Sequence, residues 1–131
     1  MNEPQLYQFL KDNYYPDLTL SNDKMSRWDC YSPSTFHRIE LKCRGAHYEE
    51  LLIEKKKYDG LHKKCGCNID SPIYINSTPK GIYRFDLFDI EPDWQIQSHN
   101  KTTEFEDNKK IAKEVGFLNI EKAEILYKFK I

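Results

Sequence analysis

The chain has 131 residues and a formal net charge of −1 at pH 7, and 39% of its residues are hydrophobic. This length allows one hydrophobic core and is too short for a second catalytic module, so we expect a single domain over residues 1–131. No run of ~18 apolar residues and no signal-peptide pattern occurs, which predicts no membrane span and a cytoplasmic location. Richness in Lys, Asn, Ile and Tyr is compatible with an AT-rich genome, such as that of a bacterium or a phage in its host.

The first predicted element is a helix over residues 3–13. Apolar side chains such as Leu6 and Leu10 recur there at helical spacing, and Pro4 suits the first turn of a helix. Glu3 also suits this end, because the helix dipole is positive there. We therefore expect the chain to begin with an amphipathic helix.

A β-hairpin is predicted next. Residues 27–31 and 36–43 are typical of strands, and residues 32–35 between them, Ser-Pro-Ser-Thr, are turn formers. If Ser34 and Thr35 form the tip, Asp29 on the first strand lies directly across from Glu40 on the second. The hairpin then brings two carboxylates together.

Glu40 and Lys42 are two residues apart, so they share one face of the second strand. Phosphodiester hydrolysis needs a cation that offsets charge on the phosphate and holds a water molecule. Mg²⁺ or Mn²⁺ suits Asp29 and Glu40, with the backbone carbonyl of Leu41 as a possible third ligand. Lys42 is placed to orient or deprotonate the water, or to stabilise charge that develops on the phosphate.

Asp29 followed by Glu40-Leu41-Lys42 resembles the motif of the PD-(D/E)XK nuclease superfamily, although Trp28 stands where the name has proline. The resemblance implies a restriction-endonuclease-like α/β fold, a central mixed β-sheet flanked by helices, in the order helix, three-strand meander, helix, strand. It implies that Asp29 and Glu40 bind metal, that Lys42 acts in catalysis, and that cleavage leaves a 5′-phosphate. It also suggests Glu3 as a further metal ligand and Lys55 as a polar residue that the second helix directs into the site.

The remaining elements are predicted from periodicity and turn residues. Gly45 ends the hairpin, and apolar spacing predicts a helix over residues 48–64 with Lys55 on its apolar stripe. Farther on, we expect strands over residues 72–76 and 81–87, a turn at 91–94, a polar loop over 99–107, a helix over 108–115 that Gly116 ends, and a short last element over 120–127.

The charge distribution favours a nucleic-acid partner, DNA or RNA. Charge does not distinguish the two, and DNA is the first choice. Residues 38–64 contain eight Lys or Arg against five Asp or Glu, whereas residues 65–131 contain nine against eleven. Arg38 and Arg44 flank the motif and are the best candidates for phosphate contact, with Lys55 as a weaker one. The other lysines of this region fit either a phosphate-attracting patch or a solvated helix face, namely Lys56, Lys57, Lys63 and Lys64.

Two alternatives stay open. The chain fits a catalytically inactive module of the same fold that binds nucleic acid or protein. It also fits a zinc-stabilised interaction protein that uses Cys30, Cys43, Cys65 and Cys67, although Cys30 and Cys43 are expected on the face opposite Asp29. A chain this small offers no separate recognition domain, so we expect a homodimer or a protein partner to contribute specificity.

Overall fold

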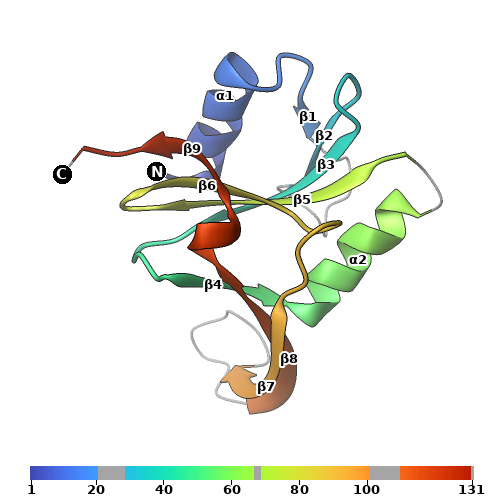
Figure 1. Ribbon diagram of the computed structural model, residues 1–131, viewed down its shortest axis with the longest axis vertical. Coiled ribbons are helices and arrows are strands. Elements are labelled where there is room, and N and C mark those ends of the chain that lie inside the picture. The colour runs from blue at the N-terminus through green and yellow to red at the C-terminus, as the bar shows by residue number, and fades with distance from the viewer. Residues whose placement is uncertain (21–28, 67–68, 101–109, 131) are drawn as a thin grey trace.

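A computed structural model describes residues 1–20, 29–66, 69–100 and 110–130. The described chain is a mixed α/β structure of two sheets and two α-helices (Figure 1). In chain order the elements are α1 (Glu3–Asn13), β1 (Thr19–Leu20), β2 (Asp29–Ser32), β3 (His37–Cys43), β4 (Glu50–Glu54), α2 (Lys55–Cys65), β5 (Ser71–Thr78), β6 (Gly81–Asp86), β7 (Asp93–Asn100), β8 (Lys110–Asn119), a 3-10 turn (Ile120–Lys122) and β9 (Glu124–Lys128).

The larger sheet has six strands in the order β1-β2-β3-β5-β6-β9, and the smaller has three in the order β4-β8-β7. All pairs are antiparallel except β3 with β5, which are parallel. The first elements are therefore a helix, three consecutive antiparallel strands, a second helix that follows β4, and a strand that pairs with β3. Parallel neighbours need such a crossover connection, which here runs through β4 and α2.

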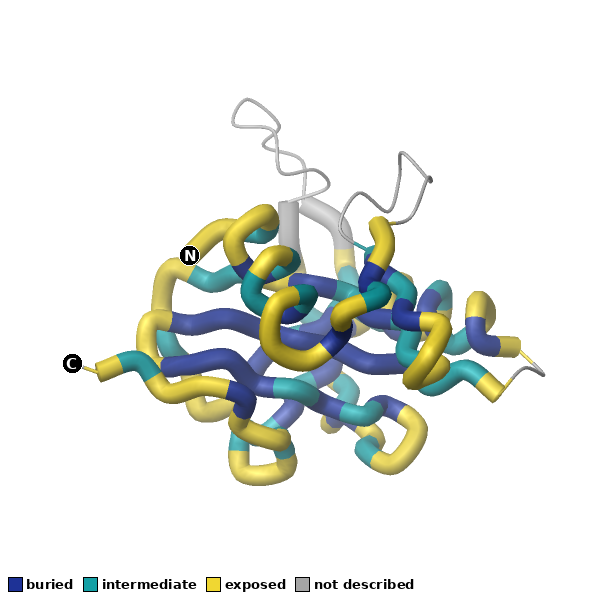
Figure 2. Tube along the Cα trace, turned by 90° about the horizontal axis from the view of Figure 1, so that it is seen from above, coloured by how far each residue is buried: buried dark blue, intermediate teal, exposed yellow. Residues whose placement is uncertain are grey.

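Each face of the larger sheet carries its own hydrophobic core. Helix α1 covers one face, while α2 and the smaller sheet lie against the other (Figure 1). The α1 core includes Leu6, Leu10, Cys30, Ile39, Leu41, Ile73, Ile75 and Ile82. The core on the α2 side includes Leu51, Ile53, Tyr58, Leu61, Tyr74, Tyr83, Phe85 and Leu118. The central strands are accordingly buried between exposed turns and helix surfaces (Figure 2).

The predicted first helix is confirmed as α1. Asn2 and Gln5 form a capping box, in which the Asn2 side chain accepts from the Gln5 amide and the Gln5 side chain accepts from the Asn2 amide. These two bonds satisfy amides that have no partner inside the helix. Leu6 and Leu10 are fully buried against the sheet, so the helical stripe faces the core as its spacing predicts.

The predicted helix over residues 48–64 is wrong in its first part. Residues 50–54 form strand β4, and α2 begins only at Lys55. Leu51 and Ile53 alternate into the core of the α2 side, and Leu51 lies across from Leu118 of β8. Leu51 fits both a helical and an alternating pattern, and the strand partner 67 residues away decides between them.

The predictions for the C-terminal part are also partly wrong. Residues 93–100 and 110–117 pair as β7 and β8, where we expected a turn, a loop and a helix over 108–115. The predicted helix end, Gly116, instead lies inside β8 beneath Trp94, where a Cβ atom would come within 2.8 Å of the ring. Residues 101–109, with the predicted loop contacts and helix cap, lie outside the described residues.

The two strands predicted after α2 are confirmed, and each predicted range differs slightly from the observed one. The first is the eight-residue β5, which is almost entirely buried, and the second is β6. The short last element consists of the 3-10 turn and the edge strand β9, which pairs with β6. The start of the predicted strand over 27–31 lies outside the described residues, and its remainder is β2.

Candidate functional site

The β2–β3 hairpin places Asp29 directly across from Glu40, as the sequence predicts. The strands are joined by a four-residue turn, since Ser32 pairs with His37. Asp17 stabilises this turn by accepting hydrogen bonds from the Ser32 hydroxyl and the Ser34 amide, both at 2.7 Å. Those two bonds lower the pKa of the Asp17 carboxyl. The stabilised turn fixes the register of β2 against β3, and that register places Asp29 beside Glu40.

The two carboxylates lie on the sheet face that α2 covers. Ile39 and Leu41, on either side of Glu40, are buried in the α1 core, so Glu40 points the other way. The Arg44 amide donates to the Ser77 carbonyl of β5. Backbone N–H and C=O groups point to opposite neighbouring strands at successive residues, so those of Glu40, four residues before Arg44, also point towards β5. Asp29 and Glu40 are thus a non-hydrogen-bonded antiparallel pair, whose Cα atoms lie about 4.5 Å apart. The Leu41 carbonyl is directed to the other side, towards β2.

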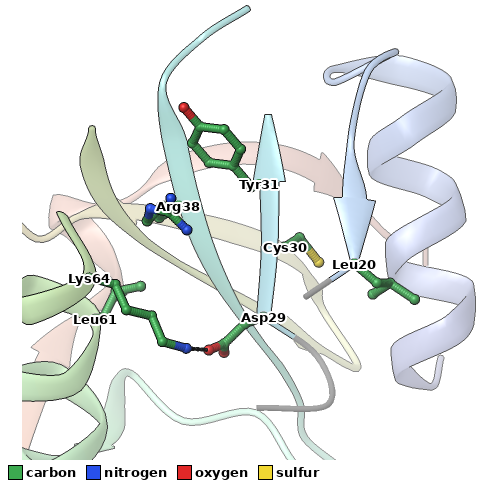
Figure 3. A pocket seen from close by; sticks show the side chains of 7 residues that line it. All are labelled: Leu20, Asp29, Cys30, Tyr31, Arg38, Leu61 and Lys64. Carbon is green, nitrogen blue, oxygen red and sulfur yellow. Dashed lines mark hydrogen bonds and ion pairs between the residues drawn. The ribbon is translucent and has the colours of Figure 1, made fainter. Parts of the chain in front are cut away.

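Two lysines of α2 neutralise the carboxylates. Lys64 Nζ lies 2.5 Å from Asp29 Oδ2, and Lys57 Nζ lies 3.4 Å from Glu40 Oε1. Both carboxylate side chains are largely buried, with exposed fractions of 13% and 16%. Figure 3 shows Lys64 reaching from the helix across to the start of β2, where it meets Asp29. The site is therefore a carboxylate pair enclosed by cationic groups.

One oxygen of Asp29 is not used by these contacts. Oδ1 is buried and has no hydrogen-bond partner among the residues that the structure describes. A buried acceptor without a partner is costly unless a cation, a donor or water reaches it. The free oxygen therefore suits a cation, and carboxylate oxygens such as those of Asp29 and Glu40 are donors that Mg²⁺ or Mn²⁺ prefers. The described residues contain no group of three His, Cys, Asp or Glu side chains placed to hold a metal ion, so water or substrate oxygens would complete the coordination.

Lys42 lies on the same face as Glu40, two residues farther along β3, and its side chain is exposed. The Glu-x-Lys pair thus presents an acid and an ammonium together, as predicted. Lys42 is across from Asn76 of β5, so it lies towards the end of the sheet away from the hairpin turn. An exposed ammonium at this place can meet a ligand that approaches Asp29 and Glu40 from solvent.

Arg38 occupies the next row of the same face, towards the hairpin turn. Its Nε donates to Asp70 Oδ2 at 2.9 Å, and its guanidinium stacks on the Tyr31 ring at 4.4 Å from the centroid. The Tyr31 hydroxyl donates to the other Asp70 oxygen at 3.0 Å. Arg38, Tyr31, Asp29 and Lys64 line one pocket of about 310 Å³, together with Leu20, Cys30 and Leu61 (Figure 3).

Three other predicted site residues are not brought to the carboxylates. Glu3 starts α1 and lines a different pocket with Cys43 and Arg44. Arg44 is used within the fold: its guanidinium donates to Asn76 Oδ1 at 2.7 Å, to the Tyr74 hydroxyl at 3.2 Å and to the Leu52 carbonyl. It therefore ties β5 to β4.

Lys55 reaches away from the carboxylate pair as well. Its ammonium pairs with Asp59 at 3.0 Å and stacks over the Trp94 ring of β7 at 4.7 Å. Lys57 and Lys64, whose positions in the sequence fit either a phosphate-attracting patch or a solvated helix face, occupy the place predicted for Lys55. Lys57 lies four residues before the buried Leu61 and Lys64 three residues after it, so all three share one face of α2. With the helix start placed at Lys55, this spacing predicts that the two lysines face the sheet.

The described cysteines do not gather into a zinc site. Cys30 is buried and Cys43 half-buried on the α1 face, opposite Asp29, as predicted, and Figure 3 shows the Cys30 sulfur turned towards α1. Burial, helped by the nearby Asp29 charge, raises the pKa of the Cys30 thiol to about 12. Cys65 is buried in α2, and burial raises its pKa too. Thiols held in the protonated form are poor metal ligands; Cys67 lies outside the described residues.

Comparison of the chain with family models, with curated proteins and with solved structures gave no match. In the described part of the chain, no helix is long and apolar enough to cross a membrane.

Proposed function

We propose that this protein is a Mg²⁺- or Mn²⁺-dependent nuclease that hydrolyses phosphodiester bonds, with DNA as the favoured substrate over RNA. The observation that carries the proposal is the carboxylate pair: Asp29 and Glu40 face each other across one hairpin, and Asp29 Oδ1 has no partner among the described residues. Two adjacent acids with a free, buried oxygen are suited to a hard divalent cation.

The arrangement of elements supports a restriction-endonuclease-like fold as part of this proposal. The chain runs helix, three-strand meander, helix and a strand that pairs with β3, which is the order that the PD-(D/E)XK resemblance implies. The acids stand on the second and third strands of the meander, Asp29 on β2 and Glu40 on β3. Strand β4 and the β7–β8 hairpin are additions to that order.

Each residue of the site has a distinct proposed role. Asp29, Glu40 and the Leu41 carbonyl would hold the cation, which when bound offsets phosphate charge and lowers the pKa of a water molecule. Lys42 orients that water or stabilises the charge that develops on the phosphate. Lys57 and Lys64 attract the phosphate backbone, and they balance the carboxylates while no ligand is bound. Cleavage by water opposite the 3′ oxygen then leaves a 5′-phosphate.

The test is cleavage of single-stranded and duplex DNA and RNA in Mn²⁺, Mg²⁺ or EDTA. Wild type should cut in either metal and not in EDTA, and both Asp29→Asn and Lys42→Ala should abolish cutting. Lys63→Ala is a matched control, because Lys63 is exposed on the same helix and has no described contact with the carboxylates. Metal-dependent cutting that survives Asp29→Asn would refute the assignment.

The second candidate is a catalytically inactive module that binds nucleic acid or a protein partner. The observation in its favour is that both carboxylates are already neutralised by lysines. It predicts nucleic-acid binding that persists in Asp29→Ala, without cutting and without Mn²⁺ binding that depends on Asp29 and Glu40. Isothermal titration with Mn²⁺ separates the two candidates. A homodimer or partner that supplies specificity is compatible with both, as is a cytoplasmic location.

A further inference from the structure

Arg38 is held by two groups that do not touch the carboxylate pair. Asp70, whose side chain is only 7% exposed, accepts from Arg38 Nε with one oxygen and from the Tyr31 hydroxyl with the other. The Tyr31 ring lies against the guanidinium plane. A guanidinium fixed at Nε and stacked on one face has lost most of its rotational freedom. Among the described residues its Nη atoms have no hydrogen-bond partner.

The position of Arg38 relative to the carboxylates is set by the strand. Tyr31 and Arg38 are directly across from each other in the hairpin, two residues from Asp29 and Glu40 respectively. Two residues along a strand span about 7 Å, and both pairs point to the same face. Arg38 therefore stands one row away from the carboxylate pair, in the same pocket as Asp29 and Lys64.

The chemistry of this row suits a phosphodiester. A fixed guanidinium with free Nη groups presents two parallel donors, which match two oxygens of a phosphate. Asp70 is the acid that pairs with Arg38 in this row, and its two oxygens already accept hydrogen bonds from Arg38 and Tyr31. An anion is therefore favoured at the exposed edge of Arg38, and a cation is favoured at Asp29 and Glu40.

We infer that Arg38 binds the backbone phosphate next to the one that is cleaved, and that Asp70 and Tyr31 are positioning residues for it. This inference rests on the proposed function for the identity of the neighbouring site. The substrate is then a polynucleotide that continues past the cleaved bond on the Arg38 side. A mononucleotide ester or a strand end at that side lacks the phosphate that Arg38 takes.

The first experiment measures binding without chemistry. Fluorescein-labelled single-stranded and duplex oligodeoxynucleotides are titrated in EDTA by anisotropy at several salt concentrations. Arg38→Gln should weaken binding about tenfold and reduce the slope of log affinity against log salt by about one, as loss of one phosphate contact predicts. Arg84→Gln is the matched control, because Arg84 is also paired with a carboxylate, Glu124, but lies on the α1 face. It should change neither value appreciably.

Asp70→Asn tests whether Asp70 positions Arg38 or acts only through its charge, because the two roles change nucleic-acid affinity in opposite directions. Removing a negative charge beside the pocket should tighten binding if only net charge matters. If Asp70 positions Arg38, binding should instead weaken several-fold. Glu124→Gln is the control, since it removes the carboxylate of the Arg84 pair and should leave binding unchanged or slightly tighter. Thermal unfolding of each variant identifies any that fails to fold, and Tyr31→Phe, which keeps the ring, then replaces Asp70→Asn with the same expected sign.

The second experiment locates the phosphate. Single neutral methylphosphonate groups are placed in turn on either side of the cleaved bond. One adjacent position should weaken wild-type binding and have little further effect on Arg38→Gln, because both changes remove the same contact. Equal affinity of Arg38→Gln and wild type, tighter binding of Asp70→Asn, or fully additive losses at every position would overturn the inference. If the contacts are found but wild type cuts nothing in Mn²⁺, the proposed function fails and the phosphate site stands.

Discussion

Lys64 Nζ lies 2.5 Å from one oxygen of Asp29, while the other oxygen of Asp29 is buried and has no partner among the described residues. The ammonium therefore stands where a cation bound to Asp29 would feel strong repulsion. Under the proposed function, Lys64 and the metal would compete for the Asp29 carboxylate, and bound nucleic acid, by attracting the lysine, would favour the metal. Binding of metal and of nucleic acid should accordingly strengthen each other by the same factor.

Lys64→Gln should raise the Mn²⁺ affinity of the nucleic-acid-free protein several-fold, because it removes the competing ammonium. Isothermal titration with Mn²⁺ measures the change. Lys63→Gln, the same change of charge on the next residue of α2, serves as the control and should leave the affinity nearly unchanged. Unchanged or weaker Mn²⁺ binding in Lys64→Gln would show that the ion pair does not oppose the metal.

Arg44→Met should destabilise the fold without touching the site. It removes partly buried hydrogen bonds to Asn76, Tyr74 and the Leu52 carbonyl, of which the Leu52 carbonyl still accepts from the Tyr74 hydroxyl. We expect a loss of roughly 2–4 kcal/mol in the free energy of unfolding, measured by urea denaturation. Lys42→Gln, which changes an exposed side chain, should cost little. Weakened nucleic-acid binding with full stability in Arg44→Met would instead restore the sequence-based prediction that Arg44 contacts phosphate.

The stability of the protein should fall as the pH drops below the ordinary histidine pKa of 6.5, because of His37. Burial, and then the positive charge of Arg84, lower the pKa of this half-buried histidine from 6.5, against the opposing effect of Asp86 and Glu124. Between the two pKa values the unfolded chain binds the proton and the folded chain does not, so acid favours unfolding.

Thermal unfolding at several pH values checks this, and His37→Gln should flatten the curve in that window. The carboxyls of Asp17 and Glu91 have lowered pKa values, so they take up protons at a lower pH than histidine and do not contribute to the stability change in this pH range. An equally steep curve in His37→Gln would assign the dependence to other groups.

Gly116→Ala should destabilise the protein by about 1–3 kcal/mol, because overpacking displaces neighbours. Its Cβ would stand 2.5 Å from the Pro92 Cβ and 2.8 Å from the Trp94 ring. Urea denaturation followed by tryptophan fluorescence measures the loss. Gly60→Ala is the control, since nothing lies within 4 Å of its Cβ position in α2, and alanine there should stabilise by up to ~1 kcal/mol. A stabilising Gly116→Ala would contradict the packing of β7 on β8.

Local sequence patterns predicted the parts of the fold that depend on neighbours in the chain. Helical spacing and Pro4 in the first turn predicted α1, and turn residues with two-residue alternation predicted β2, β3 and the register of Asp29 with Glu40. These features are decided within about a dozen residues, which is the range that periodicity and turn chemistry report.

The smaller sheet was not predictable in this way. Strand β4 became a strand because Leu51 and Ile53 pair with β8, and residues 110–115 became a strand because β7 lies beside them. Either segment also fits a helical pattern, so the outcome depends on partners far along the chain. Tertiary pairing overrides local preference where that preference is weak.

The sequence alone determined the acids of the candidate site and the lysine that accompanies them, since strand alternation and hairpin register place Asp29, Glu40 and Lys42 on one face. Only the tertiary structure decided which cations surround them. The packing of α2 on the larger sheet brings Lys57 and Lys64 to the carboxylates and turns Lys55 towards Trp94. Asp70, directly before β5, pairs with Arg38. The reason is physical: the rotation of a helix over a sheet is set by the core beneath it, and that core is assembled from distant segments.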